Sequence, residues 1–222
     1  TRACAHSLWG YTRSTMYLPP QFKSDDRSHA LALMRGYPLA SLISTDDAGC
    51  PYVTHLPLHV EEQGNELVLL GHVAKPNPHW RYLQARPQAL VTFLGPHAYL
   101  SPAVYPDLKR VPTWNYLAVH CKVEASLIEE ADAKDRLLKK LIGDHEPAYA
   151  AQWRSLGEDY AHKMLAGIMA FELRVTELQC KLKLNQHRPE AHAAMRQAYA
   201  AGNQDERVLG EWMDRLGIGE KS

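Results

Sequence analysis

Stretches in which apolar and polar residues alternate predict most of the regular structure of this chain, because successive side chains of a strand point to opposite faces of its sheet. In Tyr52–Val60, the even-numbered residues are predicted to face one way and the odd-numbered residues the other. Turn sequences rich in Asp, Asn and Gly separate several stretches, which is typical of hairpins. Strands are predicted over Leu39–Thr45, Tyr52–Val60, Glu66–His72, Ala89–Leu94, Ala98–Tyr105, Tyr116–Ile128 and Ile168–Leu178.

Other stretches space their apolar residues three or four positions apart, which gives a helix one apolar face. In the helix predicted over Pro76–Ala85, Asn77 is predicted to be the cap, and Trp80 and Leu83 are predicted to face inward. Six or seven strands joined mostly by hairpins do not follow the strand–helix alternation of a parallel sheet. The predicted fold class is therefore α+β, an antiparallel β-barrel with peripheral helices. Helices are predicted over Ser28–Arg35, Pro76–Ala85, Asp132–Ile142, Pro147–Leu156, Arg188–Ala201 and Val208–Leu216.

The chain of 222 residues is long enough for one large domain and shows no internal repeat, low-complexity stretch or linker. Its first fifteen residues show no periodicity and precede Met16. Thr1–Thr15 are therefore predicted to be a leader that is not native to the fold. Residues 16–222 are predicted to form a single domain.

Composition narrows the function classes. Lys and Arg together number 25, as do Asp and Glu, so the formal net charge is zero. This balance argues against a protein that binds nucleic acid through bulk charge. The four cysteines are widely spaced and form no Cys-x-x-Cys pair, which is typical of reduced thiols in a cytoplasmic protein. No apolar run approaches the roughly 20 residues of a membrane span, so no membrane association is predicted.

Polar and aromatic residues gather at the ends of the predicted strands between residues 52 and 116, where a plain core would not need them. Lys75 follows the strand that ends at His72 and precedes a predicted helix start. A helix N-terminus offers free N–H groups and the positive end of a dipole, so together with a lysine it suits a phosphate group. Asn77 and His79 strengthen this interpretation. The alternative is an ordinary solvated lysine.

His55 and His59 lie on the same predicted strand face, and with His72 or His120 they would suit a metal ion. No local metal-binding motif is present, however, and the 12 histidines make chance pairs common. No metal is therefore predicted, and His55 is interpreted as a hydrogen-bonding residue beside an aromatic ligand.

Asp144 and His145 resemble a catalytic pair, yet their place between two predicted helices favours Asp144 as a helix N-cap. No nucleophile elbow, dinucleotide-binding or phosphate-loop motif occurs in the chain. No catalytic residue is assigned.

Two further segments carry candidate ligand contacts. Pro112 fixes the backbone ahead of Trp114, and this segment is a candidate wall for a flat ring, although most such aromatics belong to cores. Lys181, Lys183 and Arg188 place three cations within eight residues. They form either a solvated turn or a second contact for an anion.

These segments together resemble the PaiB-type FMN-binding negative transcriptional regulators. The resemblance runs from about Met16 to about Arg188. At Asn185, this chain departs from the family pattern, which usually has Ser there. Ordered matches occur in Thr54–Pro57, Gly71–Pro78, Gly95–Pro102, Pro112–Tyr116, His145–Glu146 and Lys181–Leu184.

The resemblance implies the split β-barrel of pyridoxamine-phosphate-oxidase-like flavoproteins, usually homodimers with FMN as cofactor in the groove between the subunits. It places the flavin against Thr54–Leu58 and its phosphate near His72 and Lys75, with Lys181–Arg188 closing the site. The cofactor-binding residues that it implies are Thr54, His55, Leu56, Pro57, His72, Val73, Lys75, Asn77, Trp80, Trp114, Lys183, Gln186 and Arg188.

The function that follows is a cytoplasmic, homodimeric FMN-binding protein, with repression of transcription implied by the family alone. The sequence shows no helix-turn-helix with a basic recognition face. Flavin-dependent oxidation or reduction of a small molecule is one alternative. Haem binding, which occurs in related split barrels, is another.

Overall fold

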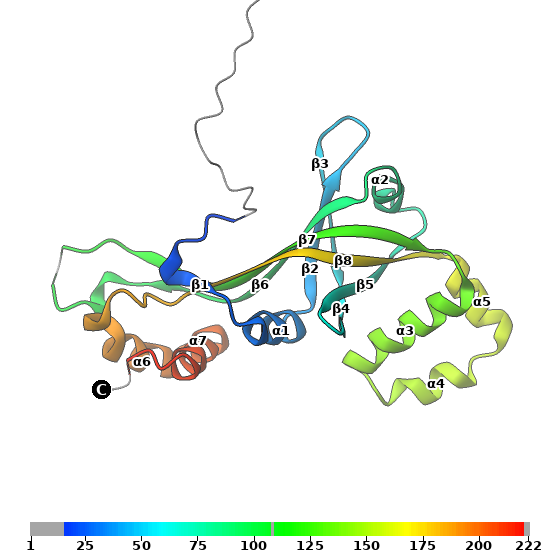
Figure 1. Cartoon of the computed structure of the whole chain (residues 1–222). Coiled ribbons are helices and arrows are strands. Elements are labelled where there is room, and N and C mark those ends of the chain that lie inside the picture. Colours follow the sequence, from blue (N-terminus) through cyan, green and yellow to red (C-terminus); the bar gives the residue numbers. More distant parts are fainter. Residues whose placement is uncertain (1–15, 108, 220–222) are drawn as a thin grey trace, which may run out of the picture.

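A single antiparallel sheet of eight strands organises the computed structural model, which describes residues 16–107 and 109–219. The strand order is β3-β2-β6-β7-β8-β5-β4, and β1 pairs with β8 outside this path. This confirms the predicted α+β class (Figure 1). The predicted leader Thr1–Thr15 lies outside the described residues. The strands are β1 (Lys23–Ser24), β2 (Leu39–Thr45), β3 (Pro51–Pro57), β4 (His59–Gln63), β5 (Glu66–Ala74), β6 (Gln88–Leu100), β7 (Thr113–Ile128) and β8 (Ile168–Lys183).

The predicted strand Tyr52–Val60 is in fact two strands, which stand at the two ends of the strand order. β3 pairs with β2, whereas β4 pairs with β5 at the other end of the strand order. The amide of Leu58 still bonds to the carbonyl of Pro38 at 3.1 Å, in register with the β2–β3 ladder. Pro38 has no N–H to donate in return, and the pairing with β2 ends there. The alternation itself is correct, because Leu56, Leu58 and Val60 are all buried.

Two other strand predictions need correction. The stretches Ala89–Leu94 and Ala98–Tyr105 belong to one strand, β6, whose pairing with β7 shifts register between Leu94 and His97. That strand ends at Leu100 and is followed by a 3-10 turn over Pro102–Val104. β8 continues to Lys183, beyond the predicted end at Leu178, because an irregularity opposite Lys122 and Val123 lets pairing with β7 resume.

The core fills the barrel and also extends to its outside. Leu67, Leu69 and Val73 of β5 belong to the main core cluster. Val68 and Leu70 of the same strand pack on the opposite face in a second cluster with α3. Both faces of β5 are therefore covered, which explains its nearly continuous apolar sequence.

Helices cover the sheet in groups. α3, α4 and α5 connect β7 to β8 at one end of the long strands, α1 lies against the middle, and α6 and α7 lie under the other end (Figure 1). No helix among residues 16–107 and 109–219 is long and apolar enough to cross a membrane. The helices are α1 (Arg27–Gly36), α2 (His79–Ala85), α3 (Ala131–His145), α4 (Tyr149–Ser155), α5 (Glu158–Ala166), α6 (His192–Ala200) and α7 (Gln204–Arg215), with further 3-10 turns over Pro20–Phe22 and Pro189–Ala191.

Some helix predictions also differ from the structure. α2 begins at His79 rather than Pro76, and the predicted helix over Arg188–Ala201 is a turn and a 3-10 segment before α6. α5 was not predicted. Of its residues with described side chains, only Leu165 is buried, so the sequence gives little apolar periodicity there.

Candidate functional site

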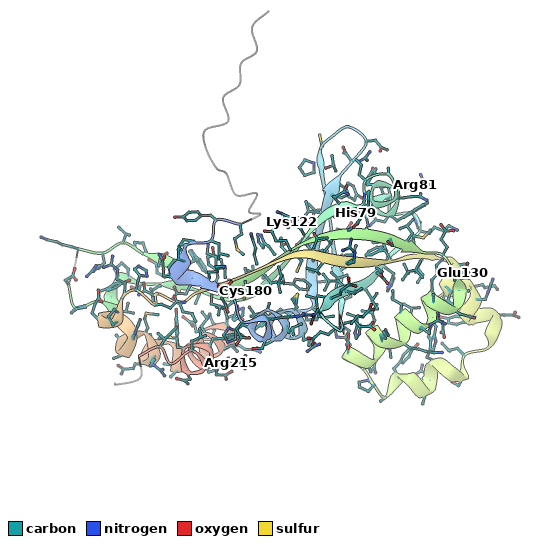
Figure 2. The ribbon with its side chains drawn as sticks, viewed as in Figure 1. His79, Arg81, Lys122, Glu130, Cys180 and Arg215 are labelled. Atoms are coloured by element: carbon teal, nitrogen blue, oxygen red, sulfur yellow. The ribbon has the colours of Figure 1, made fainter. Side chains whose placement is uncertain are left out.

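A buried histidine joins α2 to the end of the barrel. His79 is fully buried, and its two ring nitrogens bond to the hydroxyl groups of Thr54, at 2.8 Å, and Ser44, at 2.9 Å. Burial lowers the pKa of His79 to about 4, so the ring is neutral at physiological pH. Figure 2 labels this residue where α2 meets the barrel. The neutral imidazole therefore links α2 to both strands of the β2–β3 hairpin through hydrogen bonds.

Asn77 holds the turn before α2 against β3. Its Oδ1 accepts hydrogen bonds from the amide of His79 at 3.0 Å and from the hydroxyl of Tyr52 at 3.4 Å, while its Nδ2 donates to Thr54 Oγ1 at 3.3 Å. Asn77 was predicted to be the helix cap, but the N-cap position belongs to Pro78, whose side chain makes no capping bond. Asn77 lies one residue earlier and accepts from the amide of the first helical residue, His79. The network fixes the path of the backbone just after Lys75.

Lys75 combines a fixed backbone with a free charge. Its amide donates to the carbonyl of Gly167 at 2.8 Å, and its carbonyl accepts from Trp80 Nε1 at 3.0 Å. Its side chain is exposed and has no hydrogen-bond or ion-pair partner within the described parts of the chain. α2 is only seven residues long and its first amide is already bonded to Asn77, so an anion here depends on the ammonium group and not on a helix dipole.

His72 provides an unsatisfied polar atom next to this turn. By the alternation of β5 it shares the outer face with Val68 and Leu70, and its Nδ1 is buried without a hydrogen-bond partner. Burial lowers the pKa of His72. A buried polar atom without a partner is costly, and a phosphate or hydroxyl oxygen of a ligand would satisfy it. The residues present therefore fit the phosphate end of FMN.

The residues predicted on β3 divide between its two faces. His55 is exposed on the outer face, where its Nδ1 bonds to Ser41 Oγ at 3.0 Å, and Pro57 is exposed on the same face. Leu56 points into the barrel, as does Val73 on β5, and each is 4% exposed. Leu56 and Val73 could therefore contact a ligand only through their backbone groups.

The remaining candidates lie in a second group around the start of β7 and the end of β8. Trp114 is 54% exposed. Lys183 Nζ donates to Thr113 Oγ1 at 2.7 Å and to the carbonyl of Trp114 at 2.6 Å. Gln186 bonds to the backbone of Leu182 and Leu184, so its side chain supports the turn after β8.

One chain does not bring the two groups together. The strand register gives the separation of the two groups. Across the sheet, Lys122 of β7 is opposite Leu90 of β6, which is opposite Ile43 of β2, the neighbour of Ser44 in the His79 network. Trp114 lies eight residues before Lys122 along β7. At about 3.3 Å per residue, this separation is about 26 Å. It exceeds the length of one FMN molecule.

Asn185 has a structural reason to be asparagine. Its φ is 63°, in the left-handed region that asparagine tolerates better than most residues. Its side chain bonds to the hydroxyl of Tyr105, and its carbonyl accepts from His192 Nε2 at 3.1 Å. The departure from the family pattern at this position is therefore explained by the turn.

The N-cap interpretation of Asp144 is wrong. Asp144 lies in the last turn of α3, and its Oδ2 bonds to His59 Nδ1 at 2.6 Å. His59 is thereby directed to α3, whereas His55 bonds within the β2–β3 hairpin. Within the described residues, no group of three or more His, Cys, Asp or Glu side chains could hold a metal ion.

Comparison with known proteins now identifies the family. Residues 16–177 match the family model described as "Putative FMN-binding domain". The chain is 33% identical over 176 residues to the Protease synthase and sporulation protein PAI 2 of Bacillus subtilis, covering 79% of this chain and 84% of that protein. The chain belongs to this FMN-binding family. It is a flavin-binding protein, and FMN is the cofactor for which the family's domain is described.

Solved structures of two other proteins show the same fold. The FAD and haem binding protein of Mycobacterium smegmatis superposes with a TM-score of 0.57 at 23% identity, over 72% of this chain and 73% of that one. The flavocytochrome Anf3 of Azotobacter vinelandii superposes with a TM-score of 0.56 at 18% identity, over 72% and 69%. This member of the FMN-binding family therefore has the split-barrel fold.

Proposed function

We propose that the chain works as a homodimer that holds FMN between its two copies. The observation that carries this proposal is the separation of about 26 Å between the two groups of candidate residues. In each site, His72 and Lys75 of one copy would hold the phosphate. The flavin ring would lie between the outer face of β3, near His55, and Trp114 of the other copy. Bound FMN supplies a centre that accepts and donates electrons.

The outer face of the β3-β2-β6 part of the sheet supports this dimer. Leu39, Val53 and Leu94 are 67%, 48% and 57% exposed. The strand register aligns the three strands, with Ile43 opposite both Val53 and Leu90. Apolar side chains gathered on one face are typical of an interface, and an obligate dimer of this kind would bury on the order of 2,000 Å².

Mixed dimers test the shared site. The variants Lys75→Ala and Trp114→Ala should each weaken FMN binding. If each site draws Lys75 from one copy and Trp114 from the other, the purified heterodimer of the two variants keeps one fully wild-type site. That site should bind FMN as tightly as wild type. Loss of wild-type affinity from both sites of the heterodimer would show that each site belongs to one chain.

Repression of transcription, the role implied by the resemblance, would need a DNA-binding surface. α6 and α7 are two helices joined by a short turn, as in a helix-turn-helix. However, α7 carries Asp205, Glu206, Glu211 and Asp214 against Arg207 and Arg215. This acidic helix would repel DNA phosphates, so a regulator of this family would contact DNA elsewhere.

Flavin-dependent redox chemistry on a small molecule is the second candidate role, since bound FMN can accept and donate electrons. Absorbance of the purified protein separates flavin from haem, since haem gives a Soret band. A promoter fragment that shifts on electrophoresis with the FMN-loaded protein would support the regulator. We propose a cytoplasmic location, where Cys50, Cys121 and Cys180, which are free in the structure, would stay reduced.

A further inference from the structure

A second basic site lies far from Lys75. A cleft of about 310 Å³ opens between the N-terminal 3-10 turn, the connection from β6 to β7, and the turn after β8. We call it the basic cleft. Phe22, Tyr105, Arg110, Lys183, His187 and Arg188 line it.

The positive charge of the basic cleft is only partly neutralised. Arg110 bonds to Asp107 at 3.1 Å and to Glu190 at 3.2 Å, so its charge is balanced. Arg188 is half-buried, and its guanidinium group has no hydrogen-bond or ion-pair partner among the residues that the structure describes. Its charge is left for a ligand.

Lys183 adds a second available donor. Its ammonium group has three protons and uses two of them, on Thr113 and on the carbonyl of Trp114. Burial, together with the neighbouring charge of Lys181, lowers the pKa of Lys183. An anion in the cleft would offset both effects, since it would restore a partner for the charged form.

The turn that presents Arg188 is rigid. The carbonyl of Asn185 accepts the amide of Arg188 at 3.0 Å as well as the ring of His192, and the side chain of Asn185 is tied to Tyr105. The ring of His187 packs edge-on against Phe22, with 5.5 Å between the ring centroids. The cleft is thus a preformed pocket that combines aromatic walls with donors for an anion.

We propose that the basic cleft binds the anionic group, a carboxylate or a phosphate monoester, of a small aromatic ligand other than FMN. The inference rests on the proposed function, because FMN has a single phosphate group and that group is already assigned to His72 and Lys75. The exposed ring of His187, which packs on Phe22, and the guanidinium group of Arg110, which lies over the Tyr105 ring at 5.0 Å, favour a planar body on the ligand. Arg188 and Lys183 hold its charged end.

Calorimetric titration of the FMN-loaded protein tests the proposal, with benzoate and phenyl phosphate as probes and benzamide as the uncharged control. Wild type should bind one or both anions saturably at one per chain and should not bind benzamide. Arg188→Gln should weaken anion binding by roughly ten- to a hundredfold, the loss expected for a charge-assisted hydrogen bond. Arg86→Gln is the matched control, because Arg86 is, like Arg188, a half-buried arginine, but it is paired with Asp47 at 2.9 Å. It should leave anion binding unchanged.

Three outcomes would overturn the proposal. Wild type could fail to bind either anion, or Arg188→Gln could bind both as wild type does while keeping its melting temperature. Alternatively, Arg188→Gln could weaken FMN and spare riboflavin, which would place the FMN phosphate in the basic cleft. If wild type binds no FMN, the proposed function fails on its own, and the same titration of FMN-free protein still tests the cleft.

Discussion

His79 makes the stability of the fold depend on pH. The pKa of its imidazole falls from 6.5 to about 4 on folding, so the unfolded chain binds a proton more readily than the folded one. The stabilising contribution is complete above pH 6.5 and is lost as the pH falls to about 4. The free energy of unfolding should therefore drop by about 3 kcal/mol over this window from His79 alone.

Denaturant melts at several pH values measure this drop. His79→Gln should be less stable at neutral pH, by about 1–3 kcal/mol for the lost bonds to Ser44 and Thr54, and should show a shallower decline toward pH 4. His162→Gln, on the exposed surface of α5, should follow the wild-type profile. An unchanged decline in His79→Gln would mean that other groups cause the acid sensitivity.

Lys75 should distinguish FMN from riboflavin. Removing its ammonium group in Lys75→Ala loses a charge-assisted contact to phosphate, so the Kd for FMN should rise by roughly ten- to a hundredfold. Riboflavin has no phosphate and should bind the variant as it binds wild type. Fluorescence titration of both ligands measures the difference, with Lys163→Ala on α5 as the control. Equal losses for FMN and riboflavin would remove Lys75 from the phosphate site.

At the scale of single residues, the sequence could predict the role of a side chain only where its bonding partners are close to it in the sequence. The bond of Asn77 to the amide of His79 was predictable because the two residues are neighbours in the sequence, whereas its bonds to Tyr52 and Thr54 were not. The partners of His79 were not, since Ser44 and Thr54 come from two other strands and their hydroxyls are unremarkable in an alternating pattern. Asp144 was misassigned for the same reason, because His59 lies 85 residues away in the sequence.

Among the elements, the seam between β3 and β5 should be the most sensitive to added volume. A Cβ atom at Gly71 would lie 2.5 Å from Leu58 Cδ2 and 3.2 Å from Leu56 Cδ1. Gly71→Ala should therefore destabilise the fold by about 1–3 kcal/mol and push β3 outward, which should also weaken FMN binding.

Thermal melts and FMN titration of the same samples measure both effects. Gly143→Ala is the matched control, because nothing lies within 4 Å of a Cβ at that position of α3. That variant should be slightly more stable, since alanine favours a helix over glycine by roughly 0.5–1 kcal/mol. A Gly71→Ala protein as stable as wild type would show that the seam can adapt.

Alternation located the elements well and their boundaries less well. β2 has its predicted bounds, and its end is marked by the Asp and Gly residues of the hairpin loop that follows it. The break at Leu58 was hidden, because the burial pattern runs unchanged from β3 into β4 while the hydrogen-bond partners change. Only the position of Pro57 hinted at it.

For the whole molecule, dimerisation and FMN binding should be lost together. Leu39→Asp places a charge on the exposed apolar face without removing core atoms, so the monomer should stay folded. Light scattering at micromolar concentration should then show a monomer where wild type is a dimer, and FMN affinity should fall with it. Tyr160→Asp, at a 51% exposed aromatic on α5, is the control and should remain a dimer. A wild-type monomer that still binds FMN would refute the shared site.

The central place of β8 has a consequence for how the chain is made. β8 pairs with β1, β5 and β7, so strands from the beginning and the middle of the sequence depend on a strand that ends at Lys183. β5 can pair with β4 at once, but roughly 100 further residues must emerge from the ribosome before its second partner, β8, exists. During that time the Leu67–Leu70 run offers an apolar strand edge to other chains. Folding should therefore be slow and largely post-translational, and solubility during synthesis should depend on how quickly β8 appears.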